Sequence, residues 1–151
     1  KLKTGDPAPA FEAVDQDGNM KTLADYRGRK LILYFYPKDN TPGCTAEACS
    51  LRDGRDTLRR MGFEVVGVSP DSEKSHQGFI AKQGLNFTLL ADTDKKIAEA
   101  YGVWGEKKFM GRTFMGILRT TFVIDEQGVI EKIFDKVRTK DHFEQIVEAY
   151  Q

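Results

Sequence analysis

The fold is decided by residues 31–49, which have the sequence LILYFYPKDNTPGCTAEAC. The first six residues form a continuous apolar run, which is typical of a strand buried on both faces of a sheet. From Pro42 to about Met61 the pattern becomes helical, and Gly62 ends it. Both cysteines of the chain, Cys44 and Cys49, lie near the start of this predicted helix. The junction between strand and helix is therefore also the first candidate site.

Strands and helices alternate along the rest of the chain. An N-terminal hairpin is expected over residues 11–23, with a tight turn at Asp17-Gly18. The stretch 71–73 is expected to cap a helix that runs to about Gln83, with Gly84 as its stop signal. Further strands are expected at 64–68, 87–90, 120–124 and 129–134, and further helices at about 94–101 and 141–150. Residues 102–116 combine four glycines with three large aromatic residues, a composition that favours a long ordered loop.

This order of elements predicts one domain over residues 1–151, an α/β three-layer sandwich in which helices flank a central sheet. The sheet should be mixed, because the last two strands are joined by a tight turn and must run antiparallel. At 151 residues the chain is long enough to bury a core without disulfide staples.

The composition argues against several classes of partner. Because 23 basic residues balance 23 acidic ones, nothing points to nucleic acid or an anionic membrane surface. No apolar stretch approaches the ~20 residues of a membrane span, and residues 1–5 lack the apolar core of a signal peptide. Two cysteines do not make a disulfide framework, and such sparse usage fits a reducing compartment. We therefore expect a cytoplasmic protein without a nucleic-acid or membrane partner.

The position of Cys44 favours a reactive thiol. Thr41 is placed to act as the N-cap, and Pro42 suits the first helical position, where its missing N–H costs nothing. Cys44 then falls in the first turn, where free N–H groups and the positive end of the helix dipole favour a thiolate over a thiol. An inert buried thiol is the alternative, since free cysteine is among the most buried residue types.

Cys49 follows Cys44 by five residues, which is too far for a disulfide within an intact helix. An ideal helix puts the two Cα atoms ~8.6 Å apart, whereas a disulfide needs about 7 Å or less. The pair can close only if the first turn or two of the helix unwinds, so we expect a folded and a locally unwound conformation. The spacing also excludes a thioredoxin-type Cys-x-x-Cys site. Considered alone, Cys49 could equally be a core residue.

A stabilised thiolate beside a second thiol is the arrangement that forms a sulfenic acid and then traps it as a disulfide. The expected oxidant is a peroxide, and cleavage of its O–O bond needs donors on both oxygens. We expect these donors to be the Thr41 hydroxyl and the N–H groups of Gly43 and Cys44. Arg119, at the mouth of the strand expected at 120–124, is the first candidate for a fixed positive charge, and Arg112 is the weaker one.

These residues resemble the active-site motif of the peroxiredoxins, Pro37-x-x-x-Thr41-x-x-Cys44. The likeness covers essentially the whole chain and is closest to the bacterioferritin comigratory protein (peroxiredoxin Q) subfamily. It is also carried by residues 5–11, 34–39, 47–53, 87–92, 102–107 and 119–125. The resemblance implies a thioredoxin-like fold and thiol peroxidase activity without haem, flavin or metal.

The resemblance also implies a role for each site residue. Cys44 would be the peroxidatic cysteine and Cys49 the resolving one, joined in an intramolecular disulfide. Thr41 and Arg119 would activate thiolate and peroxide, and Pro37 would shield the pocket from water. The implied substrates are hydrogen peroxide and organic hydroperoxides, the implied reductant is thioredoxin or a similar dithiol, and the implied state is a monomer.

Two other functions stay open. The first is a disulfide reductase or metal-delivery protein, against which the long cysteine spacing counts. The second is a redox sensor or chaperone that responds through unwinding near Cys49. His76 and His142 lie on separate predicted helices without ligand-like spacing, so we expect solvated surface histidines rather than a metal site. Trp104, Phe109 and Phe114 could line the pocket or pack the loop. We favour packing, with some of them reaching the rim of the site.

Overall fold

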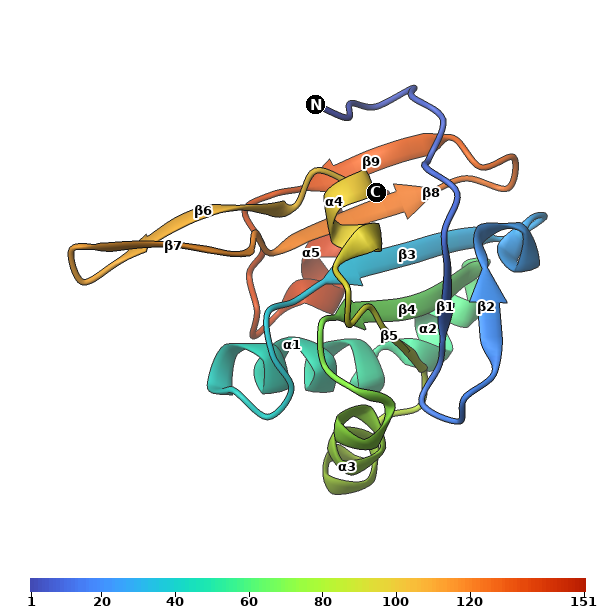
Figure 1. Ribbon diagram of the computed structural model, residues 1–151. Helices are drawn as coiled ribbons and strands as arrows, with labels where there is room; N and C mark the ends of the chain where they lie inside the picture. Colours follow the sequence, from blue (N-terminus) through green and yellow to red (C-terminus); the bar gives the residue numbers. More distant parts are fainter.

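A five-stranded mixed sheet forms the centre of the computed structural model, which describes all 151 residues (Figure 1). Its strand order is β5 (Thr88–Ala91), β4 (Phe63–Ser69), β3 (Lys30–Phe35), β8 (Thr120–Ile124) and β9 (Ile130–Phe134). β3, β4 and β5 are parallel, and β8 runs antiparallel to both β3 and β9. Residues 31–35 of the central strand are at most 1% exposed, which explains why that run is entirely apolar.

The two faces of the sheet are covered by different elements. One face lies under α1 (Pro42–Asp53), α2 (Arg55–Arg60), α3 (Glu73–Gln83) and α5 (His142–Glu148), and the other under β1 (Glu12–Val14), β2 (Met20–Thr22), the 3-10 helix η1 (Leu23–Tyr26) and α4 (Lys96–Ala100). Each face buries its own apolar cluster. The predicted sandwich with a mixed central sheet is therefore confirmed. None of its helices combines the length and the apolar character that crossing a bilayer demands.

The single helix predicted from Pro42 to Met61 is in fact two helices, interrupted at Gly54. The phenyl ring of Phe143 on α5 lies so close to Gly54 that a side-chain carbon there would clash with it. The absence of a side chain lets α5 pack directly on the end of α1. The N–H of Phe143 also donates to the Ser50 hydroxyl at 3.0 Å, so α5 holds the second half of α1.

The prediction of a loop at residues 102–116 is wrong. Strands β6 (Trp104–Phe109) and β7 (Arg112–Ile117) pair there as a hairpin that projects from the body of the molecule (Figure 1). Met110 and Gly111 form its two-residue turn with φ of 52° and 78°, the left-handed geometry that matches the twist of a hairpin. Gly105 and Gly116 sit opposite each other in the hairpin. The number of glycines obscured the strand pattern.

The aromatic residues of this hairpin do not behave alike. Phe109 is 67% exposed and Phe114 is 46% exposed, so the expectation that they pack is wrong for both. Trp104, at the base of the hairpin, does pack against the apolar cluster that includes Tyr101 and Ile117.

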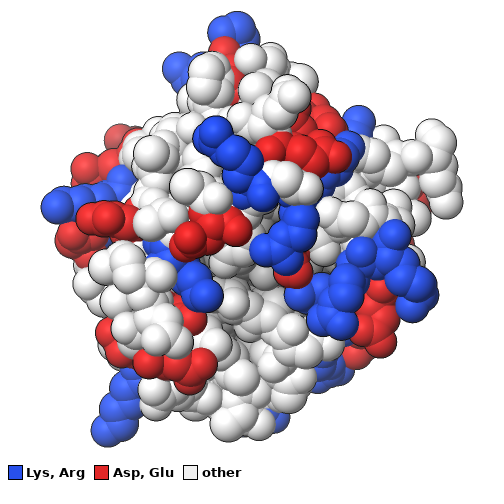
Figure 2. Space-filling view, turned by 90° about the vertical axis from the view of Figure 1, so that its right-hand side faces the viewer, with Lys and Arg blue, Asp and Glu red and all other residues white.

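The end of the molecule opposite to the hairpin carries basic and acidic side chains intermixed (Figure 2). This distribution agrees with the balanced total of 23 basic and 23 acidic residues. This end therefore offers no extended surface of one sign for a polyanionic partner.

Both histidines are fully buried, so the prediction of solvated surface histidines is wrong. On α3, His76 and Phe79 are the two buried residues, three positions apart on one helical face. On α5, His142 and Ile146 are the buried pair, four positions apart. The same 3.6-residue periodicity that identifies core leucines therefore indicates the buried histidines.

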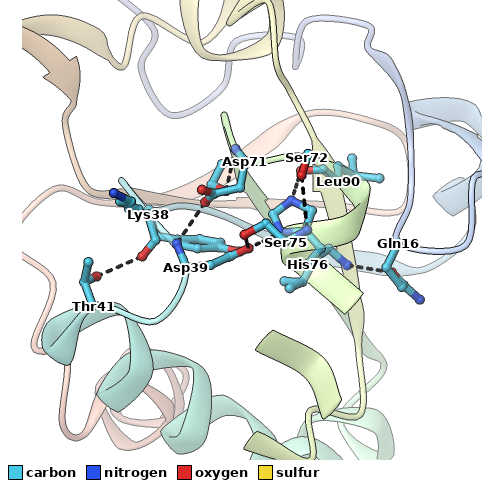
Figure 3. Close-up of polar contacts among 12 residues, drawn as sticks. Gln16, Lys38, Asp39, Thr41, Asp71, Ser72, Ser75, His76 and Leu90 are labelled. Carbon is cyan, nitrogen blue, oxygen red and sulfur yellow. Dashed lines mark hydrogen bonds and ion pairs between the residues drawn. The ribbon is translucent and has the colours of Figure 1, made fainter. Parts of the chain in front are cut away.

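His76 belongs to a polar network that fixes the loop between β3 and α1 (Figure 3). Its Nδ1 lies 2.7 Å from one carboxylate oxygen of Asp39, which also accepts a hydrogen bond from the Ser75 hydroxyl at 2.8 Å. The other oxygen accepts from the Tyr36 hydroxyl at 2.6 Å. The N–H of Asp39 donates to Asp71 at 2.8 Å. The loop that leads into α1 is thus tied to α3 and to the end of β4.

Asp39, Asp71 and His76 offer ligand atoms within 4.8 Å of one another. Protein donors already engage the oxygens, and the second ring nitrogen of His76 lies 2.9 Å from the carbonyl oxygen of Leu90. The cluster is therefore a hydrogen-bond network that holds the loop between β3 and α1.

The substitution His76→Leu is expected to lower the free energy of unfolding by about 3–5 kcal/mol, because it leaves the buried Asp39 carboxylate without its imidazole partner. Urea denaturation followed by circular dichroism measures the effect. Lys74→Leu, an exposed position on the same helix, should change the same free energy by no more than about 0.5 kcal/mol. Equal effects of the two substitutions would contradict the assignment.

Candidate active site

Cys44 lies in the first turn of α1, directly beyond the carboxyl end of the central strand β3. Thr41 is the N-cap residue and Pro42 the first helical residue. The thiol is 1% exposed. The N–H groups of Gly43 and Cys44 have no acceptor within the protein. The sulfur therefore sits where unpaired backbone donors and the helix dipole favour negative charge.

The Thr41 side chain does not cap the helix. Its hydroxyl donates to the carbonyl oxygen of Lys38 at 2.8 Å, within the loop before α1. Because the hydroxyl proton is committed there, Thr41 has only lone pairs to offer to a further partner. Its hydroxyl, predicted to be a donor, is an acceptor in this conformation.

Arg119 bridges the cysteine and a buried carboxylate. One guanidinium nitrogen, Nη2, lies 3.3 Å from the Cys44 sulfur, and the other, Nη1, lies 2.6 Å from Oε1 of Glu47. The residue lies between the hairpin and β8, so it joins the start of β8 to α1. Arg112, the weaker candidate, lies exposed on β7.

Glu47 was not identified as a site residue from the sequence. It lies three residues after Cys44, on the same helical face, and is fully buried. Its Oε2 atom has no hydrogen-bond partner and lies 3.7 Å from Nε2 of His142. Burial raises the pKa of Glu47 to about 7, an effect that Arg119 partly opposes. The spacing of three residues on a helix was the signal that could have found it.

Cys49 faces away from this group. Its sulfur is half-buried and lies 3.7 Å from the side-chain oxygen of Gln83 on α3. Both cysteines are free, and both belong to the uninterrupted helix α1. The two sulfurs therefore have different neighbours, and α1 is in the wound conformation.

A hollow of about 590 Å³ lies beside the site, and Arg119 forms part of its wall. The remaining wall is partly apolar, with Val103, Leu118 and Phe122, and partly basic, with Lys107. Pro37, expected to shield the pocket, is half-buried and lies two residues after the end of β3. Arg119 thus connects this hollow with the Cys44 sulfur, which does not itself line it.

Comparison with known proteins agrees with this geometry. The chain matches the AhpC/TSA family over residues 4–133. It is 48% identical to peroxiredoxin Bcp of Escherichia coli, over 97% of this chain and 94% of that one.

Two solved structures share the fold. A crystal structure of a cysteine mutant of Xylella fastidiosa PrxQ matches with a TM-score of 0.92 at 34% identity, covering 99% of this chain and 96% of that one. The bacterioferritin comigratory protein of Xanthomonas campestris, studied for its alkyl peroxide reduction activity, matches with a TM-score of 0.86 at 35% identity, covering 92% and 88%. The resemblance found in the sequence is confirmed. The chain therefore belongs to the AhpC/TSA family, as a relative of the peroxiredoxins named Bcp.

Proposed function

We propose that Cys44 is the nucleophile of a thiol peroxidase that reduces hydrogen peroxide and organic hydroperoxides. The observation that carries the proposal is the guanidinium of Arg119, 3.3 Å from the buried sulfur at the start of α1. A fixed cation and the free N–H groups of a first helical turn stabilise a thiolate. A thiolate so stabilised attacks peroxide oxygen and becomes a sulfenic acid.

In the proposed first step the sulfur attacks one peroxide oxygen in line with the O–O bond. An S–O bond forms as the O–O bond breaks, so the cysteine is oxidised, the peroxide is reduced, and the leaving oxygen takes up a proton. Negative charge moves from sulfur to that oxygen. Arg119 and the N–H groups of Gly43 and Cys44 are suited to stabilise it along this path. Thr41, with its own proton donated to Lys38, is suited to accept the O–H of the peroxide.

The hollow beside Arg119 supports organic hydroperoxides as substrates. Its apolar wall would accept a hydrocarbon group, with the Arg119 guanidinium lying between the hollow and the Cys44 sulfur. The activity of the Xanthomonas campestris relative on alkyl peroxides agrees with this assignment. In the same proposal Pro37 limits the access of water to the sulfur.

In the proposed second step the Cys49 thiol condenses with the Cys44 sulfenic acid, giving an intramolecular disulfide and one water molecule. Because Cys49 faces α3, α1 must unwind before the two sulfurs can meet. A dithiol such as thioredoxin would then reduce the disulfide by exchange. We propose that the protein acts as a monomer in the cytoplasm, where reducing conditions suit its two free cysteines.

Peroxide consumption coupled to thioredoxin, thioredoxin reductase and NADPH tests the proposal. The native chain should turn over, Cys44→Ser should be inactive, and Cys49→Ser should react with one equivalent and then stop. Activity retained in Cys44→Ser would reject the nucleophile and favour disulfide exchange. Consumption limited to one equivalent in the native chain, with reductant present, would favour a sensor.

Replacement of Arg119 by lysine should slow the oxidation of Cys44 by roughly 10²–10³-fold, the usual cost of losing one preorganised transition-state donor. Lysine keeps the charge but cannot bridge the sulfur and the Glu47 carboxylate at once. A single-turnover assay with hydrogen peroxide measures the rate constant. Arg112→Lys, exposed on the hairpin, is the matched control and should react at the native rate. Similar losses in both variants would remove Arg119 from the site.

Unwinding of α1 should become easier as the pH rises towards neutrality. The pKa of Glu47 is about 7 in the wound helix, above the 4.5 of an exposed glutamic acid. The stabilisation from its protonated form is therefore complete below pH 4.5 and is lost as the pH rises through 7. Hydrogen exchange over residues 42–52, corrected for intrinsic rates, should show weaker protection at pH 8 than at pH 5.

The substitution Glu47→Gln should remove most of this pH dependence, because its side chain does not titrate. Glu148→Gln, at an exposed carboxylate of α5, should retain it. Protection that depends equally on pH in both variants would show that another group controls the opening.

A further inference from the structure

His142 is the first residue of α5, lies outside the peroxiredoxin motif, and is fully buried. Its Nδ1 lies 2.8 Å from the side-chain oxygen of Gln145. The backbone fixes the orientation of that amide, whose nitrogen donates to the carbonyl of Lys136 and whose oxygen accepts from the N–H of Arg138. Nδ1 thus faces an acceptor and must carry a proton. In the neutral ring, the lone pair is therefore on Nε2.

Nε2 of His142 points towards Glu47 of the active site. It lies 2.8 Å from the hydroxyl of Thr121 on β8 and 3.7 Å from Oε2 of Glu47. The second distance is longer than a hydrogen bond, but it is short enough for a charge on one group to act on the other. Oε2 is the carboxyl oxygen that has no hydrogen bond, whereas Oε1 binds Arg119.

The charges around this pair come from several elements. Arg119 faces Glu47 from the sheet, Cys44 faces it from α1, and Tyr34 approaches from β3 with a hydroxyl that also lacks a partner. The charges of Arg119, Arg138 and Asp141 act on His142. Burial raises the pKa of Glu47 to about 7 and lowers the pKa of His142 to about 4, so burial disfavours the charged form of each.

We propose that His142 is a positioning residue of the peroxidase site, and that it forms with Glu47 one coupled acid–base pair whose proton balances the Cys44 thiolate. With Cys44 and Glu47 both ionised, two buried anions face one guanidinium. A proton on the pair removes the surplus negative charge. The positive charge of Arg119 then acts on the sulfur and the peroxide instead of being neutralised by Glu47. The inference rests on the proposed role of Cys44 as nucleophile.

Nitrogen-15 NMR of the reduced native protein tests the coupling directly. Between pH 5 and pH 9, the His142 ring signals should shift with the same midpoint as an inflection in the rate constant for Cys44 oxidation by hydrogen peroxide. In Glu47→Gln the ring should stay neutral over this range, and that inflection should disappear. Ring signals that respond identically to pH in the native protein and in Glu47→Gln would overturn the proposal.

Substitution at His142 tests its effect on the reaction. His142→Phe keeps an aromatic ring against Phe134 and should slow Cys44 oxidation at pH 7 by about tenfold, with a changed pH profile. Val147→Ala, a packing change elsewhere on α5, should keep the native profile. A native profile in His142→Phe would reject the role. If His142→Phe does not fold, the NMR comparison still decides.

These outcomes separate the inference from the function on which it rests. A native chain that consumes no peroxide refutes the proposed function itself. A native chain that consumes peroxide while His142 and Glu47 titrate independently refutes only the inference.

Discussion

One interaction ties the first turns of the active-site helix to the sheet, the bridge that Arg119 makes between the Cys44 sulfur and the Glu47 carboxyl group. The arginine directly precedes β8, whereas both of its partners belong to α1. The same guanidinium therefore supplies charge to the sulfur and holds the helix in place. Any event that removes the negative charge of Cys44, such as its oxidation, weakens both functions together.

Two buried histidines contact the segment around α1, one before the helix and one within it. Unwinding of the helix affects their contacts differently. His76 secures Asp39, which precedes α1, so its network can persist when the first turns of the helix open. His142 faces Glu47, which lies within the turns that must open before Cys49 can approach Cys44. In the proposed cycle, His76 holds the residues before α1 in place while the helix unwinds. His142 loses its contact with Glu47 in the same step.

The sequence predicted what depends on local pattern and missed what depends on packing. The apolar run at 31–36 and the placement of Cys44 after Thr41 and Pro42 follow from strand burial and helix-start preferences, and both appear in the structure. The β6–β7 hairpin was missed because glycine usually interrupts strands, whereas here two glycines face each other. The burial of His76 and His142 was missed because histidine is a polar residue type. Their spacing from Phe79 and Ile146, three and four residues, indicated that they lie on the buried face of their helices.

The cost of burying Glu47 explains how a helix in a stable core can still open. A buried carboxyl oxygen without a hydrogen bond costs about 1–3 kcal/mol, against a total stability of about 5–15 kcal/mol for a domain of this kind. This cost falls in the turns of α1 that the proposed cycle must unwind, and the unpaired Tyr34 hydroxyl of β3 adds a similar cost beside them. Local opening is thereby made easier than global unfolding. The residue that orients Arg119 for the attack on peroxide is thus also the residue that keeps α1 close to opening, so reactivity and release are set by the same buried carboxyl group.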